Sequence, residues 1–135
     1  MKPSEQTVGV WIKLADEVLH RAFPLDSRAI RHATRIAFNV DDRLKPIAFL
    51  HDIPEDTHIT IEDLIKLGFP SYIIDAVRLL THLKGVSNMD YWTAIKTSPD
   101  ALEVKRKDIN DNLNDQPSDH ARQKYAIALK FFDEP

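Results

Sequence analysis

The sequence predicts an all-α fold, a compact single-domain bundle of about seven or eight helices. Apolar residues recur at the spacing of a helical face in almost every segment of the chain. Proline, glycine, serine and aspartate interrupt this pattern at positions typical of helix ends, and no segment sustains the alternation of a strand. The 135 residues suit one domain with one hydrophobic core, and neither an internal repeat nor a linker divides them.

The first two expected helices lie on either side of a proline. Apolar residues at helical spacing cover residues 8–22, and Pro3-Ser4 before them is a start signal. Pro24 ends this helix, because its ring does not fit a helix interior. Asp26 or Ser27 can then cap the second helix by accepting hydrogen bonds from its free backbone N–H groups.

The third and fourth helices are expected between two further stop signals. The aspartates at 41–42 open the third helix, which should end at residues 51–52 because Pro54 cannot continue it. Thr60, with an aspartate three residues later, resembles a capping box for a short fourth helix.

Four more helices are expected in the second half of the chain. The fifth covers about residues 71–81, and Asn88 can cap a sixth that runs to Lys96. Ser98-Pro99 begins a seventh helix, since proline is tolerated in a first turn. Pro117-Ser118 begins the last.

Composition limits the kinds of site and partner. The chain has no cysteine, so a metal must be held by His, Asp, Glu, Asn or water. Its formal net charge of −3 does not provide the broad basic surface that polyanion binding needs, so we expect neither nucleic acid nor membrane as a partner. A local cluster of Lys and Arg can still serve a small anionic ligand, and a homo-oligomer remains open.

A cytoplasmic location is expected from the distribution of apolar residues. The N-terminal segment does not resemble a signal peptide. The densest apolar run, Ile47 to Leu50, is far too short to span a bilayer.

One adjacent pair, His51-Asp52, is the strongest candidate for metal chemistry. It offers an imidazole and a carboxylate from one rigid place, a mixture that suits ions such as Mn²⁺. His32 on the preceding helix and Asp108 on a late helix can complete a set of four ligands. Such a set leaves coordination positions open for water and phosphate oxygen, as a catalytic metal site requires.

Each of these residues also has an ordinary structural interpretation. A histidine-aspartate pair is most often a solvated helix end, His32 alone is a partly buried histidine, and Asp108 alone is a charge on a helix. The other four histidines are expected to be of this ordinary kind and not to be ligands: His20, His58, His82 and His120.

Two acidic residues follow the candidate metal pair. Glu55 and Asp56 can orient an attacking water or take its proton; the alternative is a solvated acidic turn. Together with Asp52 they crowd like charges into one short segment, which is tolerable if a cation neutralises them.

These motifs resemble those of the HD superfamily. The pattern is a spaced His32, then the His-Asp-x-x-Glu-Asp-Thr run from 51 to 57, then a Val-Lys-x-x-Asp-x-x-x-Asn run from 104 to 112. More narrowly, it is similar to the hydrolase domain of the RelA/SpoT family and its small stand-alone relatives, over about residues 20–115. The resemblance implies an HD-type bundle and the Mn²⁺-dependent removal of the 3′-pyrophosphate from guanosine tetra- and pentaphosphate, giving GDP or GTP and pyrophosphate.

The resemblance also implies roles for individual residues. Glu55 and Asp56 match the acidic pair that places the nucleophilic water. Asn112 matches an asparagine near the sugar of the substrate, and Lys105 matches a lysine near the site or packed beside it. Apart from these matches, Arg28 or Arg21 is a candidate for stacking on a base. The implied metal ligands are His32, His51, Asp52 and Asp108.

The chain departs from the family pattern at two places. Arg106 and Lys107 stand where small or apolar residues are usual, and they can bind phosphate or face solvent. The loop before His32 is shortened, and Ala33 replaces a proline. These departures bear on the guanine preference more than on the metal site.

Three functions therefore stay open at the level of sequence. The first is a stand-alone alarmone hydrolase acting on a small nucleotide substrate. The second is an HD phosphohydrolase acting on another nucleotide or on the 2′-phosphate of NADPH. The third is a non-catalytic nucleotide-sensing domain, which would not need Glu55 and Asp56.

Overall fold

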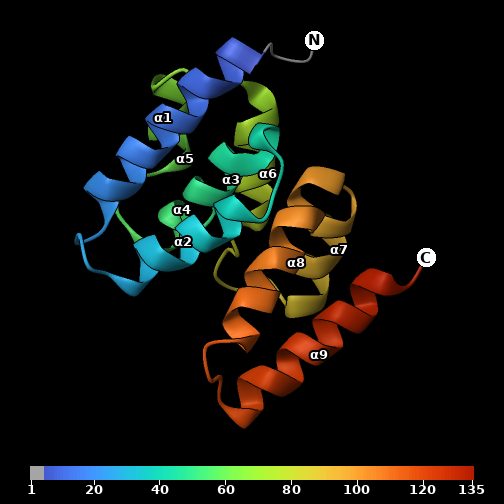
Figure 1. Cartoon of the computed structure of the whole chain (residues 1–135). Helices are drawn as coiled ribbons and strands as arrows, with labels where there is room; N and C mark the ends of the chain where they lie inside the picture. Colours follow the sequence, from blue (N-terminus) through green and yellow to red (C-terminus); the bar gives the residue numbers. More distant parts are fainter. Residues whose placement is uncertain (1–4) are drawn as a thin grey trace.

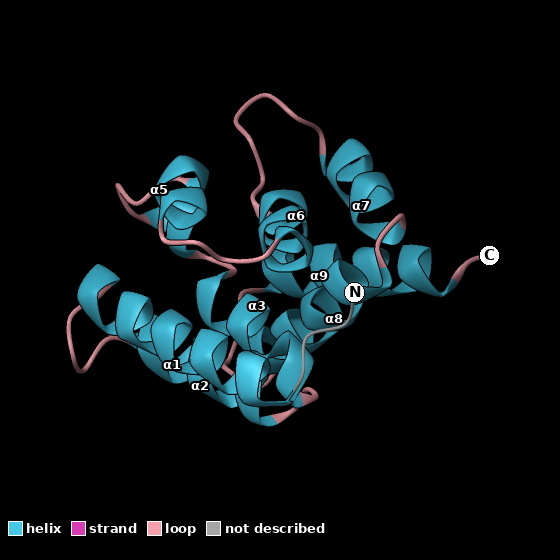
Figure 2. Ribbon diagram, turned by 90° about the horizontal axis from the view of Figure 1, so that it is seen from above, coloured by secondary structure: helices cyan, strands magenta, loops and turns pink. Residues whose placement is uncertain are grey.

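The chain folds into an all-α bundle, as predicted. The computed structural model describes residues 5–135, and no strand occurs in that part of the chain (Figure 2). Pro3-Ser4, the expected start signal, lies outside the described residues. The elements are α1 (Glu5–Ala22), α2 (Arg28–Phe38), the 3₁₀ turn η1 (Asp42–Leu44), α3 (Lys45–Leu50), α4 (Ile53–Asp56), α5 (Ile61–Lys66), α6 (Ser71–Leu80), α7 (Asn88–Lys96), α8 (Pro99–Leu113) and α9 (Asp119–Asp133).

The helix ends follow the capping chemistry of the sequence, with two corrections. The aspartates at 41–42 do not open the third helix: they lead into the 3₁₀ turn η1 without a side-chain cap, and α3 begins only at Lys45. Ser27 caps α2 by accepting the backbone N–H of Ile30, and Thr60 forms the expected capping box at α5. The cap of α7 is Ser87, not Asn88 as the sequence suggested. Ser87 is extended and accepts from the third N–H of the helix, whereas Asn88 already has helical geometry.

The segment after His51-Asp52 contains a short helix that the sequence analysis did not include. The third helix stops at Leu50, as expected, but the chain resumes a single helical turn, α4, at Ile53. Pro54 lies in the first turn of α4, where its missing N–H costs nothing. His51 and Asp52 therefore form the junction between two helical segments.

The core is continuous and surrounds α3. Residues Pro46 to Leu50 of α3 are all buried. Helices α1 and α2 pack on one side of α3, and α6 and α8 pack on the other (Figure 1). Because α3 is central, its C-terminal junction is held close to both α2 and α8.

The last helix lies across α7 and α8 (Figure 1). Trp92 of α7 packs against Phe131 and Phe132 of α9. Arg106 of α8 donates to the carboxylate of Asp133 and to the carbonyl of Phe132. None of the helices in residues 5–135 combines the length and the apolar character that crossing a membrane requires.

Candidate metal centre and its pocket

Four residues from three parts of the chain converge on one point. His32 lies on the inward face of α2, between the buried Ile30 and Ala33. Asp108 lies on the inward face of α8, and His51 and Asp52 form the junction of α3 and α4. Their four candidate ligand atoms all lie within 4.8 Å of one another, so the group could hold a metal ion.

The separations between these atoms suit one shared ion. His32 Nε2 lies 2.8 Å from Asp108 Oδ1 and 3.9 Å from Asp52 Oδ2. His51 Nε2 lies 3.1 Å from Asp52 Oδ2 and 3.5 Å from Asp108 Oδ1. Ligands about 2.0–2.2 Å from a divalent ion are themselves about 3–4 Å apart. The arrangement therefore needs little rearrangement to coordinate a cation.

The imidazole of His51 provides an independent test of the fit. Its Nδ1 donates to the carbonyl of Ala48 at 2.6 Å, and a carbonyl can only accept, so Nδ1 carries the proton. Nε2 is buried and makes no hydrogen bond of acceptable geometry within the described residues, although Asp52 Oδ2 lies 3.1 Å away. Buried polar atoms are rarely left without a partner. A metal ion at the centre of the group would supply that partner.

The electrostatic field at this point favours a cation. Burial of the ring alone lowers the pKa of His51, but the carboxylates of Asp52 and Asp108 outweigh it and raise that pKa well above its usual value. Burial alone raises the pKa of Asp108, but Lys105 and the two histidines hold it well below its usual range. The two carboxylates thus stay ionised, and a field that favours a proton on His51 also favours a metal ion there.

Lys105 extends the site along α8. Its ammonium donates to Asp108 Oδ2 at 3.0 Å and lies 5.3 Å from the centre of the Tyr91 ring. Burial alone lowers the pKa of Lys105, but the charge of Asp108 reverses the effect, so the ammonium stays protonated. The sequence placed Lys105 near the site, and it does line the adjoining pocket.

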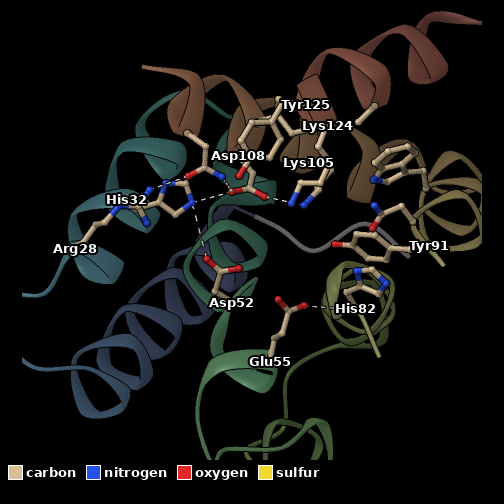
Figure 3. A pocket seen from close by; sticks show the side chains of 15 residues that line it. Arg28, His32, Asp52, Glu55, His82, Tyr91, Lys105, Asp108, Lys124 and Tyr125 are labelled. Carbon is tan, nitrogen blue, oxygen red and sulfur yellow. Dashed lines mark hydrogen bonds and ion pairs between the residues drawn. The ribbon is translucent and has the colours of Figure 1, made fainter. Parts of the chain in front are cut away.

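A pocket of about 290 Å³ adjoins the candidate metal centre and is lined by three of its four residues, His32, Asp52 and Asp108. Figure 3 shows Lys124 and Tyr125 of α9 on the side opposite Asp52 and Glu55, with Lys105 between them. Three cationic side chains, Arg28, Lys105 and Lys124, line it. Its wall is mostly polar, which suits a charged ligand rather than an apolar one.

The two acidic residues after the metal pair differ in position. Glu55 lines the pocket, and its Oε1 accepts the backbone N–H of His82 at 2.7 Å. Asp56 is exposed and is not among the residues that line the pocket. Partial burial, with the charges of Asp52 and Glu55, raises the pKa of Asp56. Of the pair, Glu55 is therefore better placed to act on a bound molecule.

The two other residues expected to contact substrate, Arg28 and Asn112, form a hydrogen bond with each other. Arg28 donates from Nη2 to Asn112 Oδ1 at 2.9 Å and from Nε to Asp115 Oδ2 at 2.6 Å. Asn112 in turn donates to Asp108 Oδ1 at 3.3 Å. Both side chains line the pocket, but Arg28 is held at its rim by Asp115.

Arg106 and Lys107 lie away from the metal centre. Neither lines the pocket at the metal centre. Arg106 fastens α9 to α8, and Lys107 lines a separate hollow beside Arg35.

Several residues of this region were not predicted from the sequence. Lys124 and Tyr125 reach the pocket only because α9 folds back across α8, and no local pattern indicates that packing. Asp111, which binds His32, lies one helical turn after Asp108, and this spacing on one helix face was an available signal. His82, which was expected to be an ordinary histidine, forms part of the pocket wall and stacks on Tyr91.

No model of a known protein family matches the chain, and no curated protein matches it. The geometry and chemistry of the site therefore carry the functional proposal.

Proposed function

We propose that the protein is an HD-type, metal-dependent phosphohydrolase acting on a small nucleotide in the cytoplasm. One observation carries the proposal: two buried histidines and two aspartates converge on one point, where Nε2 of His51 makes no hydrogen bond. Ion pairs that only stabilise a fold seldom leave such an atom unsatisfied.

Mn²⁺ is the proposed ion. Two imidazole nitrogens with two carboxylate oxygens form a mixed set of ligands that suits a divalent ion tolerant of both. Thiolate ligands, which favour zinc, are absent from the sequence. Bound there, the ion would supply charge neutralisation for a phosphoryl oxygen and lower the pKa of a water.

The charges of the pocket favour an anionic substrate. A divalent cation neutralises the carboxylates of Asp52 and Asp108, which leaves Glu55 as the remaining carboxylate among the pocket's lining residues. The same pocket is lined by three positively charged side chains, those of Arg28, Lys105 and Lys124. A pocket with this excess of positive charge suits a phosphorylated ligand.

The proposed reaction is hydrolysis of the 3′-pyrophosphate of guanosine tetra- or pentaphosphate. Water adds to the phosphorus attached to the 3′-oxygen, and the P–O3′ bond breaks. The products are pyrophosphate and GDP or GTP, with one proton passing to the 3′-oxygen. Glu55 would orient the water and accept a proton, while Lys105 and Lys124 would hold phosphate oxygens, since positioning and charge neutralisation dominate such transfers.

A product assay tests this function. Purified protein with Mn²⁺ is incubated separately with guanosine tetraphosphate, NADPH and a panel of ordinary nucleotides. The Asp52→Ala variant and chelator serve as controls. We expect pyrophosphate from guanosine tetraphosphate alone, and none from the variant. Failure to turn over any compound while Mn²⁺ is bound would contradict enzymatic function and favour a sensing domain.

One observation favours a different substrate as the second candidate. Arg28, the residue expected to contact a base, is bonded to both Asp115 and Asn112. An arginine committed in this way is less available to recognise guanine. Release of orthophosphate from NADPH or another nucleotide in the same assay would select this alternative and retain the metal centre.

A further inference from the structure

His32 has a second carboxylate partner on the side away from the metal centre. Its Nδ1 lies 2.6 Å from Oδ2 of Asp111, while its Nε2 points at Asp108 (Figure 3 shows the latter contact). The His32 side chain is 3% exposed and that of Asp111 is 15% exposed. The contact joins α2 to α8 across 79 positions of sequence.

The hydrogen bond to Asp111 places one proton on the ring of His32. An ionised carboxylate can only accept, so Nδ1 of His32 carries the proton that it donates to Asp111. Nε2 faces a carboxylate as well, Asp108 Oδ1 at 2.8 Å, so a proton held between these two atoms must leave when a metal ion binds. With Nδ1 donating to Asp111, Nε2 is the nitrogen that then offers its lone pair to the ion. A histidine with the proton on the other nitrogen would turn an N–H toward the ion and could not bind it.

Asp111 is itself held in place by an arginine. Arg35, one turn along α2 from His32, donates from Nε to Asp111 Oδ1 at 2.8 Å and from Nη2 to Oδ2 at 2.9 Å. This two-bond pair fixes both position and plane of the carboxylate. The hydrogen bonds from Arg35 and His32 also lower the pKa of Asp111, although partial burial opposes the shift.

The second histidine is oriented by different means. Nδ1 of His51 donates to the backbone carbonyl of Ala48, which is fixed by α3 itself. His32 has no such carbonyl partner among its hydrogen bonds, so its orientation depends on a side chain.

We propose that Asp111, clamped by Arg35, is a positioning residue that sets the tautomer and orientation of His32 and thereby the affinity of the site for a divalent cation. The inference rests on the metal centre of the proposed function but not on its substrate. Carboxylates that support metal-bound histidines in this way typically contribute 10- to 100-fold in affinity, as a rough scale.

The test is a titration of metal-stripped protein with Mn²⁺, following the signal of the free ion by electron paramagnetic resonance. We expect Asp111→Ala to weaken Mn²⁺ binding by about 10–100-fold. Asp111→Asn keeps the size of the side chain and serves if the alanine variant does not fold. Asp111→Asn should also weaken Mn²⁺ binding. The carboxylate of Asp111 accepts three N–H groups, one from His32 and two from Arg35, whereas the amide of asparagine has only one oxygen that can accept.

Asp100 provides a matched control on the same helix. It also accepts two hydrogen bonds from an arginine, Arg43, at 2.8 and 2.7 Å, but it does not touch His32. Asp100→Asn should leave the affinity for Mn²⁺ within about twofold of the unaltered protein. An equal loss in both variants would overturn the inference, because it would indicate a general loosening of α8.

A double variant tests the part played by Arg35. Arg35→Gln should weaken Mn²⁺ binding less than Asp111→Ala, and the combined variant should be no weaker than Asp111→Ala by more than about twofold. Additive losses would show that Arg35 does not act through Asp111. Unchanged affinity in Asp111→Ala, or no Mn²⁺ binding by the unaltered protein, would overturn the inference. A lack of turnover with these affinities as expected would instead contradict only the proposed function.

Discussion

Glu55 accepts the backbone N–H of His82 at 2.7 Å, which joins the short helix α4 to the segment after α6. His82 in turn stacks on Tyr91, with 4.3 Å between ring centres and 8° between planes. The side chain of Glu55 therefore both faces the pocket and supports one of its walls. Any test of its chemistry has to separate these two contributions.

Glu55→Gln achieves that separation. Its amide oxygen can still accept the N–H of His82, but it lacks the charge needed to take a proton. We expect Mn²⁺ affinity to be retained and kcat to fall by about 10²–10⁴-fold, the usual scale for one positioned acid or base. Steady-state kinetics and a metal titration measure the two effects. Loss of the metal in this variant would mean that Glu55 is a ligand.

Lys124 tests whether α9 contributes to substrate binding. It lines the pocket from that helix, but its side chain is exposed to solvent. Lys124→Ala should raise KM about two- to fivefold, the scale of an exposed ion pair, with kcat nearly unchanged. Lys130→Ala on the same helix is the control, because Lys130 does not line the pocket. Equal KM values for the two variants would remove Lys124 from the site.

Metal binding should stabilise the fold, because the four ligands tie α2, the α3–α4 junction and α8 together. At a concentration about 100 times Kd, a bound ion adds about 2.7 kcal/mol to the free energy of unfolding. Thermal melts with Mn²⁺ and with chelator should therefore differ for the unaltered protein and coincide for Asp52→Ala. An identical Tm in Mn²⁺ and in chelator for the unaltered protein contradicts this coupling.

The capping box of α5 should make stability depend on pH in a defined direction. The backbone N–H of Thr60, followed by its side chain, lowers the pKa of Asp63. When the pKa of a carboxyl group is lower in the folded protein than in the unfolded chain, the group makes its full contribution to folding stability above the unfolded pKa, which is about 3.9 for aspartate. That contribution is lost as pH falls through the folded value. The Tm difference between the unaltered protein and Asp63→Ala should be constant near neutrality and vanish in acid.

Asp75→Ala is the control for this measurement. Asp75 is exposed within α6 and caps no helix. Its Tm difference from the unaltered protein should not follow the acid profile of Asp63→Ala. A difference for Asp63→Ala that persists unchanged at low pH would show that the capping carboxylate does not contribute through its charge.

The sequence predicted those features whose causes are local. Pro24, Thr60 and Pro99 act on the backbone within one turn, so the helix ends near them were predicted correctly. Ser87 and Asn88 are both good caps, and only the extended backbone at Ser87 distinguishes them. The turn α4 was missed because Pro54, which ends one helix, also suits the start of the next.

The residues of the candidate site likewise fall into those that the sequence predicted and those that it did not. His32, His51, Asp52 and Asp108 were identified by residue type and spacing, and the structure brings them together. The residues that were missed depend on packing between distant helices. Asp111 matters through its contact with α2, and Lys124 reaches the pocket through the docking of α9 on α8. The residues next to Lys124 in sequence give no sign of its position, whereas the spacing of Asp111 from Asp108 on one helix face was an available signal.

The most direct measurement of the central claim is the stoichiometry of Mn²⁺ binding to the metal-stripped protein. The unaltered chain and a His51→Gln variant are titrated in parallel, with His20→Gln as the control because His20 is an exposed residue of α1. We expect one tightly bound ion per chain for the unaltered protein and for His20→Gln, and none for His51→Gln. Equal binding by all three proteins, or no binding by any of them, would contradict a metal centre at His32, His51, Asp52 and Asp108.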